Sequence, residues 1–357
     1  MTAFPKTSKN LSRRGFIGAS ALAPAALMLQ AGEAHAAAST RAQLAAVHSG
    51  SPAHQLLYKT DEFFIAHRGA GNISPEHTAY AYAESVRRGA LAVEISVRTT
   101  SDGQFVCMHD TNIKRTTGAS MDVRGHTLAE LRQHKVDMRQ NLGEKTGLYD
   151  IPTLEEAIAA VDAVPAGGEY ASVGGKKVVL FLEAKDGPAQ AGLVKFITER
   201  GLQRRTVIKM YRDGSGGFKP TSRYLKLANS AGCATWCYFD GGDPIDKISA
   251  MARHENVDAI GVPYYEKPTG ASQGSMSEEN VRALTGLGKA VIVWEIHRRS
   301  AYEKYKALGV KGFMCPDPYW VIGDPFDASV KIKTGQRPHG MLPADPSVAA
   351  DMPDLTG

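Results

Sequence analysis

Residues 91–110 read LAVEISVRTTSDGQFVCMHD and hold two apolar runs, Leu91–Val97 and Phe105–His109, joined by a short polar link. The Ser-Asp-Gly of residues 101–103 has the composition of a tight turn. A link this short makes an antiparallel hairpin, because a crossover between parallel strands needs a dozen or more residues. One of the two runs is therefore predicted to be a side arm of a larger sheet.

Outward from this hairpin, the chain alternates short β-type runs with amphipathic windows such as Glu76–Arg88, Thr153–Val161 and Gln190–Arg200. This alternation is typical of a parallel α/β fold. Nine runs are predicted as strands, and without the hairpin arm eight remain, the number that closes a (β/α)8 barrel. The seven runs outside the hairpin are Phe63–His67, Val178–Ala184, Thr206–Tyr211, Ala234–Phe239, Ala259–Pro263, Ala290–Ile296 and Gly312–Cys315.

The barrel is predicted to occupy residues 61–325, with residues 111–150 as a small insertion. Residues 37–60 are expected to form a short helical N-terminal extension. Residues 326–357 are rich in Pro and Asp and are expected to form a weakly ordered tail.

Residues 1–36 have the three parts of an export signal in order. Arg13 and Arg14 precede the apolar run of residues 16–29, which is too short to span a bilayer and contains Pro24. Small residues at positions 34 and 36 predict cleavage before Ala37. The arginine pair predicts recognition by the twin-arginine export machinery, a periplasmic or extracellular location, and no stable membrane insertion.

The charge and the cysteines exclude two classes of function. Residues 1–36 carry +3 of the formal charge of +5, so the remaining +2 indicates no basic patch for nucleic acid. The four cysteines lack the paired CxxC spacing of a zinc site and are expected to be buried free thiols. They are Cys107, Cys233, Cys237 and Cys315.

Polar side chains interrupt or end four of the predicted strands. The carboxyl ends of the strands form the active face of a (β/α)8 barrel, so these groups are expected to converge there. Two imidazoles for acid and base work, cations for a phosphate and carboxylates for a divalent metal suit phosphoryl chemistry. The groups are His67 and Arg68, Glu94, His109 and Asp110, and Glu183 and Lys185.

In these motifs the chain resembles the glycerophosphodiester phosphodiesterase family, from about Phe63 to Trp320. The resemblance implies a TIM barrel and the hydrolysis of small glycerophosphodiesters to glycerol 3-phosphate and an alcohol. The motifs are His67-Arg68-Gly69, Pro75-Glu76-His77-Thr78, Glu94-Ile95-Ser96-Val97, Thr100-Ser101-Asp102-Gly103, His109-Asp110, Arg115-Thr116-Thr117-Gly118, Leu128-Ala129-Glu130-Leu131, Ile151-Pro152-Thr153-Leu154, Glu183-Ala184-Lys185, Val293-Trp294 and Gly309-Val310-Lys311-Gly312.

The resemblance also implies a role for each matched residue. His67 and His109 would be the acid/base pair, and Arg68 and Lys185 would hold the phosphate. Glu94 and Glu183 would bind a calcium or magnesium ion. Four further residues are expected near the site in supporting positions: Glu76, Ser96, Lys209 and Trp294.

Three positions depart from the family pattern. Ser96 stands where the family has an Asp that binds the metal, and a neutral hydroxyl is a weaker ligand for a hard cation. Lys209-Met210-Tyr211 replaces Gln-Ser-Phe, and the segment Cys315–Pro318 replaces Thr-Asp-x-Pro. A negative charge lost at Ser96 and a positive charge gained at Lys209 both disfavour a divalent metal.

Two alternative functions stay open at this point. A related barrel enzyme of the phospholipase D type would act on intact lipid, and would need an apolar loop to reach the membrane. A non-catalytic phosphodiester-binding protein would explain Ser96, although the presence of both His67 and His109 argues against it.

Overall fold

In the computed structural model, residues 50–167, 174–265, 274–318 and 321 are described, all within the compact unit His48–Gly357. The predicted signal (residues 1–36), residues 37–49 of the predicted extension and the predicted tail (326–357) lie outside the described residues. The domain boundaries given above therefore stay predictions.

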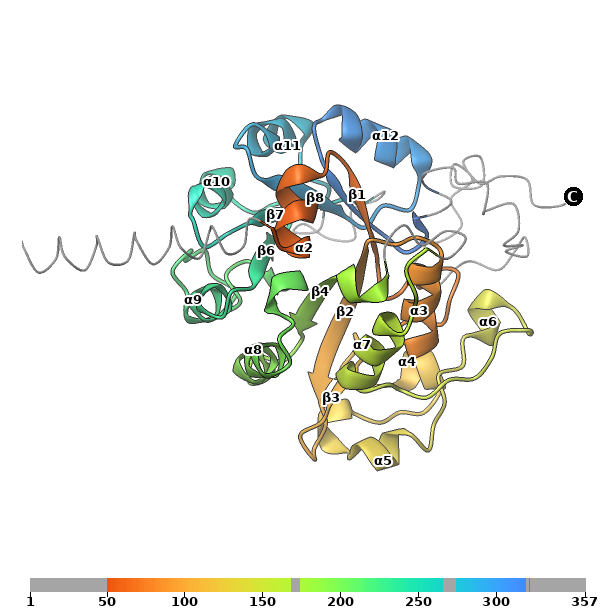
Figure 1. The fold of residues 1–357 in the computed structure, drawn as a ribbon. Helices are drawn as coiled ribbons and strands as arrows, with labels where there is room; N and C mark the ends of the chain where they lie inside the picture. The colour runs from red at the N-terminus through yellow and green to blue at the C-terminus, as the bar shows by residue number, and fades with distance from the viewer. Residues whose placement is uncertain (1–49, 168–173, 266–273, 319–320, 322–357) are drawn as a thin grey trace, which may run out of the picture. The chain divides into compact units, whose positions relative to one another are not determined.

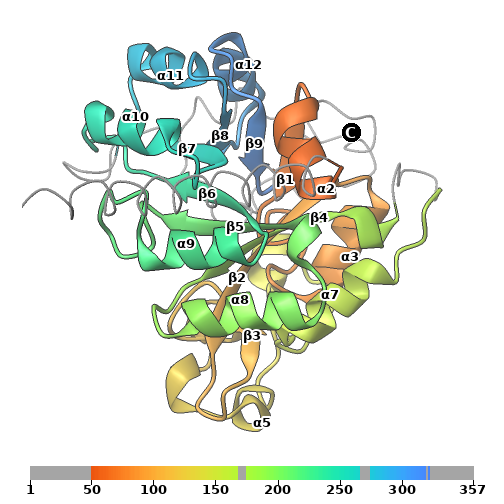
Figure 2. The ribbon, with the colours of Figure 1, turned by 60° about the vertical axis from the view of Figure 1, so that its left-hand side comes forward.

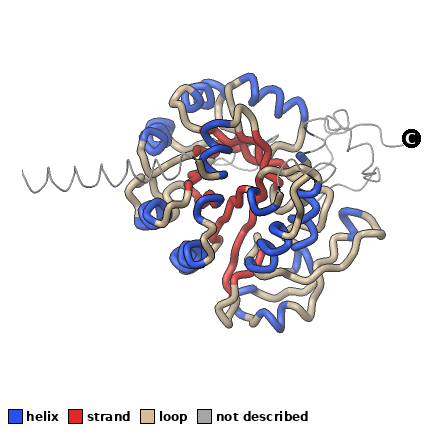
Figure 3. The backbone as a smooth tube through the Cα atoms, in the orientation of Figure 1, coloured by secondary structure: helices blue, strands red, loops and turns tan. Residues whose placement is uncertain are grey.

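The described strands form one nine-stranded sheet that closes on itself (Figures 1 and 3). The first strand pairs in parallel with both the second and the last, which closes a ring of eight, and the third strand is antiparallel to the second and lies outside that ring. The predicted (β/α)8 barrel with its hairpin arm is confirmed. The strands are β1 (Phe63–Ala66), β2 (Ala92–Thr99), β3 (Phe105–Cys107), β4 (Val179–Ala184), β5 (Thr206–Tyr211), β6 (Ala234–Tyr238), β7 (Ala259–Pro263), β8 (Ala290–Trp294) and β9 (Gly312–Cys315).

Helices surround the strands, as Figures 1 and 2 show. Each of the longer ones turns apolar side chains toward the sheet and polar side chains toward solvent, as a helix on the outside of a barrel must. They are α3 (Ala79–Arg87), α7 (Leu154–Asp162), α8 (Ala189–Glu199), α9 (Arg223–Ser230), α10 (Ile245–Arg253), α11 (Glu278–Thr285) and α12 (Arg299–Ala307).

Capping decides where the helix that follows β1 begins. The Thr78 hydroxyl accepts the Ala81 N–H at 3.1 Å, which makes Thr78 the N-cap. The predicted window started at Glu76, but this cap delays the helix to Ala79. Glu76 therefore stays in the loop after β1, at the carboxyl end of the barrel.

The interior of the barrel changes from apolar to polar along the strands. Near the amino ends it is filled by side chains such as Ala92, Phe181 and Val207, and the helical turns α2 (Pro52–His54) and η1 (Gln55–Lys59) close that end with Ala53, Leu56 and Leu57. Two residues further on each of β2, β4 and β5, the inward positions are polar, because successive residues of a strand alternate between its faces. They are Glu94, Glu183 and Lys209.

The predicted insertion, residues 111–150, contributes Ile113, Leu131 and Met138 to a small apolar core that it shares with Val106 of β3 and with Met108. It contains the short helices α4 (Lys114–Thr117), η2 (Val123–Gly125), α5 (Leu128–Leu131) and α6 (Arg139–Leu142). Helix α4 reaches the carboxyl end of the barrel through Arg115.

All four cysteines are buried and unpaired, which confirms the expectation of free thiols. In the described part of the chain, no helix is both long and apolar enough to cross a membrane.

Candidate active site

His67 lies directly after β1 and is 4% exposed. Its Nδ1 is 3.3 Å from Glu295 Oε1, and its Nε2 is 4.0 Å from Glu94 Oε2. Burial, followed by the charge of Arg68, holds the pKa of His67 well below its usual value. When no substrate is bound, the imidazole of His67 is therefore neutral near pH 7.

His109 lies two residues after β3 ends and contacts one group through each ring nitrogen. Its Nδ1 is 2.8 Å from Asp110 Oδ1, and its Nε2 is 3.3 Å from Lys185 Nζ. Because an ammonium group only donates, Nε2 is the accepting nitrogen and Nδ1–H donates to Asp110. Burial lowers the pKa of His109, although the hydrogen bond to Asp110 opposes this shift.

Arg68 has a backbone conformation that is uncommon for a side-chain-bearing residue, with φ of 54°. In that conformation its N–H donates to Glu94 Oε2 at 3.1 Å, and its guanidinium lies 3.3 Å from Glu76 Oε1. Residues held in sparsely populated conformations cluster at functional sites. The contacts of Arg68 therefore tie the loop after β1 to the carboxylate of β2.

Glu76 joins Arg68 to the insertion. Its two oxygens accept from Nη1 and Nη2 of Arg115 at 2.8 and 2.7 Å, and Arg115 Nε donates to Asp110 at 2.5 Å. Although burial alone would raise the pKa of Glu76, Arg68 and Arg115 hold it far below its usual value. Glu76 thus stands near the site, as expected, and fixes two arginines.

The buried carboxylate of Glu94 is surrounded by donors of the chain. Its Oε1 accepts from Lys209 Nζ at 3.0 Å and from the Ser96 hydroxyl at 3.1 Å, and its Oε2 accepts from the Arg68 N–H. Burial alone would raise the pKa of Glu94, but Lys209 and then His67 hold it well below its usual value. The contact of Ser96 with Glu94 places both on the same side of β2.

Glu183 is the second buried carboxylate and shares the same lysine. Its Oε1 accepts from the Tyr238 hydroxyl at 2.6 Å, and its Oε2 lies 2.9 Å from Lys209 Nζ and 3.3 Å from Lys185 Nζ. Burial opposes ionisation, yet the two lysines lower the pKa of Glu183 to about 2.

The residues present do not fit a divalent ion at Glu94 and Glu183. Calcium and magnesium need free oxygen ligands at about 2.0–2.6 Å. Three of the four oxygens of these carboxylates accept a hydrogen bond from the chain. The fourth, Glu183 Oε2, accepts none but forms ion pairs with Lys209 and Lys185 at 2.9 and 3.3 Å. Nor do any three His, Cys, Asp or Glu side chains among the described residues stand together in a way that could hold a metal. The expected metal site stays a prediction that this donor set does not support.

Trp294, the last residue of β8, packs edge-on against Tyr238, with the ring centres 5.4 Å apart. It therefore contacts the aromatic residue that donates to Glu183. The next residue, Glu295, contacts His67 as described above, and its carboxylate is 23% exposed. Burial raises the pKa of Glu295, although Arg68 opposes this.

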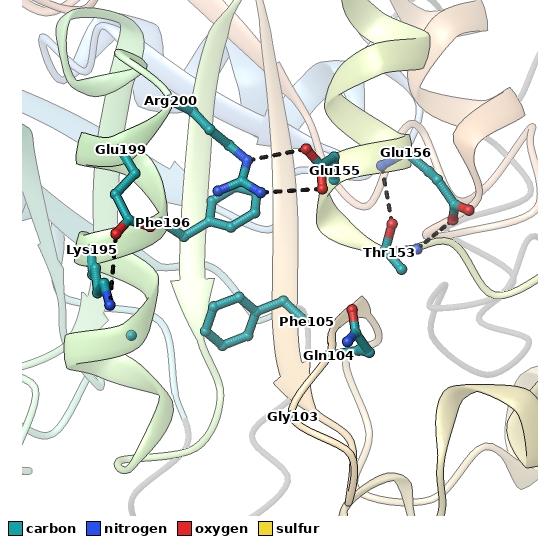
Figure 4. A pocket seen from close by; sticks show the side chains of 11 residues that line it. Gly103, Gln104, Phe105, Thr153, Glu155, Glu156, Lys195, Phe196, Glu199 and Arg200 are labelled. Carbon is teal, nitrogen blue, oxygen red and sulfur yellow. Dashed lines mark hydrogen bonds and ion pairs between the residues drawn. The ribbon is translucent and has the colours of Figure 1, made fainter.

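A separate pocket lies on the outside of the barrel, between the β2–β3 hairpin and helices α7 and α8 (Figure 4). Arg200 donates hydrogen bonds to Glu155 across this pocket. Phe105 and Phe196 also line it, and their rings meet edge to face. None of the expected site residues lines it.

Comparison with known proteins agrees with the expectation from the motifs. Residues 67–208 match the sequence model of the Glycerophosphoryl diester phosphodiesterase family. A glycerophosphodiester phosphodiesterase of Caldanaerobacter subterraneus subsp. tengcongensis is 26% identical over 264 residues, which cover 72% of this chain and 95% of that protein. Over this segment the chain is similar to the glycerophosphoryl diester phosphodiesterase family.

Two solved structures have the same fold. A phosphodiesterase of Oleispira antarctica, solved with the product sn-glycerol-3-phosphate, superposes with a TM-score of 0.56 at 19% identity and covers 73% of this chain and 95% of its own. The glycerophosphodiester phosphodiesterase of Thermotoga maritima has a TM-score of 0.51 at 20% identity, with coverages of 72% and 95%. These similarities support the TIM barrel for this chain.

The structure brings the expected site residues together at one end of the barrel. Two further contributors were missed: Glu295 at His67 and Tyr238 at Glu183. Asp110 and Arg115 were among the expected polar groups and motifs, but their link between His109 and Glu76 was not predicted. Glu295 had a usable signal, because it is a carboxylate inside the predicted run Ala290–Ile296, just as Glu94 and Glu183 lie in theirs. Tyr238 had none, since aromatic residues are common in strands.

Proposed function

We propose that this protein hydrolyses glycerophosphodiesters to glycerol 3-phosphate and an alcohol. The observation that carries the proposal is the pair of imidazoles, His67 and His109, at the carboxyl end of the barrel with the cations Arg68 and Lys185 beside them. The similarity to glycerophosphodiester phosphodiesterases supports the same reaction class.

The two imidazoles would divide the proton transfers. His109 presents an accepting Nε2, because Asp110 takes its Nδ1–H, so it would remove the proton of the attacking water as the new P–O bond forms. His67 would give a proton to the leaving alcohol oxygen as the old P–O bond breaks. A bound phosphodiester anion would offset the cations around His67, which favours its protonated form in the complex.

Arg68 and Lys185 would hold the non-bridging oxygens of the phosphate. Both are already fixed by a carboxylate, at Glu76 and Glu183, so little side-chain entropy is lost when the substrate binds. This arrangement orients the phosphorus between the two imidazoles.

The alternative reaction on intact lipid finds little support among the described residues. The large apolar side chains that are well exposed there are Tyr80 and Leu148, and Tyr80 stacks on Tyr149. Tyr149 is the chain neighbour of Leu148, and so few exposed side chains do not form an apolar patch for a membrane. A purely binding role would leave the Asp110-oriented His109 without a purpose.

One assay separates the three functions. Purified protein is incubated with glycerophosphocholine, with glycerophosphoethanolamine, and with phosphatidylcholine vesicles, and the released head group is measured. Release from the water-soluble diesters supports the proposal. Release from vesicles alone supports the lipid reaction, and calorimetric binding of the diesters without release supports the binding protein.

We also propose that the chain is exported by the twin-arginine route and acts in the periplasm or outside the cell. The support is the sequence of residues 1–36, with Arg13 and Arg14 before the apolar run. Replacing both arginines by lysine should leave the precursor in the cytoplasm, as judged by fractionation and immunoblotting. Export at the unchanged rate would point to a general secretory route.

A further inference from the structure

A lysine ammonium lies between the two buried carboxylates of the barrel. Lys209 Nζ is 3.0 Å from Glu94 Oε1 and 2.9 Å from Glu183 Oε2, and the three side chains are 7%, 0% and 6% exposed. We propose that Lys209 takes the place of the divalent metal ion in this protein, and that the hydrolysis proceeds without one. This inference rests on the proposed function.

The carboxylate oxygens that would bind an ion beside Lys209 are already in contact with its ammonium group. An ion bound to both carboxylates would have to lie about 2.0–2.6 Å from oxygens that Lys209 Nζ already bridges. To enter, it would have to displace a buried ammonium and then lie close to Lys185, 3.3 Å from the same Glu183 oxygen. An ion pair that is broken by moving one partner leaves an uncompensated buried charge, which typically costs about 3–5 kcal/mol.

Charge leads to the same conclusion. The carboxylates of Glu94 and Glu183 carry −2, and the ammonium groups of Lys209 and Lys185 carry +2, so the four groups are balanced without an ion.

Lys209 is also placed to act on a phosphate. An ammonium has three N–H donors. Lys209 donates one to Glu94 Oε1 and forms an ion pair with Glu183 Oε2, which leaves a donor for a substrate oxygen. The faces of Trp236 and Tyr238 lie 5.6 and 5.4 Å from Nζ, which keeps the charge in place. A fixed, water-excluded cation stabilises the charge that develops on phosphate oxygens in the transition state.

Metal binding and chelation test the inference in two independent ways. Calcium and magnesium are titrated by calorimetry into the wild type, Lys209→Gln, and Lys209→Gln combined with Ser96→Asp. We expect no binding to the wild type at millimolar concentrations of either ion. Each variant should bind calcium or magnesium about 10-fold more tightly or better. The gain should be largest in the double variant, because Ser96→Asp adds a third carboxylate beside Glu94 and Glu183. Melting temperatures with 5 mM calcium and with EDTA should differ for the variants and coincide for the wild type.

Lys304→Gln is the matched control, because it also removes a lysine that lies 2.9 Å from a glutamate, Glu278, but on the surface. It should bind calcium no better than the wild type. In the activity arm, the wild type is assayed on glycerophosphocholine with and without EDTA, and the rate should be unchanged.

Three results decide between the claims. Stoichiometric calcium binding to the wild type, or loss of its activity in EDTA that calcium restores, overturns the inference while leaving the proposed function intact. No hydrolysis under any condition overturns the proposed function instead, and the titrations still report whether Lys209 excludes the ion. If Lys209→Gln does not fold, the wild-type titration and the EDTA assay are sufficient.

Discussion

At the scale of single residues, each imidazole is held by a carboxylate: His109 by Asp110 and His67 by Glu295. His67→Ala and His109→Ala should each lower turnover by about 10²–10⁴, the usual effect of removing a positioned proton-transfer group. The measurement is kcat on glycerophosphocholine, with circular dichroism to confirm the fold. His126→Ala, in the insertion, is the control and should keep full activity. Full activity in either site variant would remove that imidazole from the mechanism.

The pH dependence of the melting temperature should show that the ionised carboxylate of Glu295 destabilises the fold. Burial raises the pKa of Glu295 in the folded state above its value in the unfolded chain. At a pH above both pKa values, the ionised carboxylate therefore lowers the free energy of unfolding. This destabilisation disappears at a pH low enough to protonate Glu295 in both states. Glu295→Gln should therefore melt a few degrees higher than the wild type at pH 8, and the two should melt together near pH 3.5. Activity should fall, because His67 loses a charged neighbour. A variant that melts lower than the wild type at pH 8 would mean that ionised Glu295 stabilises the fold.

At the scale of elements, an inward-facing glycine makes room for the aromatic residues of the neighbouring strand. A Cβ on Gly261 of β7 would lie 2.4 Å from Tyr238 Cβ and 2.6 Å from Trp236 Nε1. Gly261→Ala should destabilise the fold by about 1–3 kcal/mol and also lower kcat, because Tyr238 would shift away from Glu183. Urea unfolding and the hydrolysis assay measure the two effects. Gly125→Ala, where a Cβ meets nothing within 4 Å, should change neither.

The elements themselves were largely predictable, because apolar periodicity and turn chemistry are local. The predicted strands at residues 206–211, 259–263 and 312–315 agree with the observed bounds. Differences arise where a local contact outweighs the pattern, as at Thr78, whose cap delays α3 past Glu76.

The site was predictable in its members but less so in its contacts. His67, His109 and Glu183 could be identified because each ends a predicted apolar strand, and polar groups rarely interrupt such runs without a reason. The bridge from Lys209 to Glu94 joins residues 115 positions apart and exists only once the barrel has closed. The sequence could indicate that Lys209 adds a positive charge, but not that the charge lies between two carboxylates.

At the scale of the whole molecule, stability and chemistry are assigned to opposite ends of the barrel. The amino end is closed by η1, where Leu57 is 1% exposed and packs with Ala53 and Leu56 against the apolar interior, and the Tyr58 hydroxyl donates to Asp258 Oδ1 at 2.7 Å. The candidate active site lies at the carboxyl end, beyond the apolar layer of Phe181. A defect at one end should therefore leave the other nearly unchanged.

Leu57→Ala tests this separation. Removing a fully buried leucine side chain should lower the free energy of unfolding by about 2–5 kcal/mol, because it loses apolar burial and leaves a cavity under the barrel. At a temperature well below melting, kcat and KM on glycerophosphocholine should stay within about twofold of the wild type. The apolar cluster that contains Leu57 packs against Tyr238 and Trp294 of the site but does not include His67 or His109. Leu148→Ala, at a side chain that is 52% exposed, is the control and should shift stability by at most ~0.5 kcal/mol. A large loss of kcat in stably folded Leu57→Ala would show that the amino end of the barrel positions the chemistry at the other end, and the two could no longer be treated as independent.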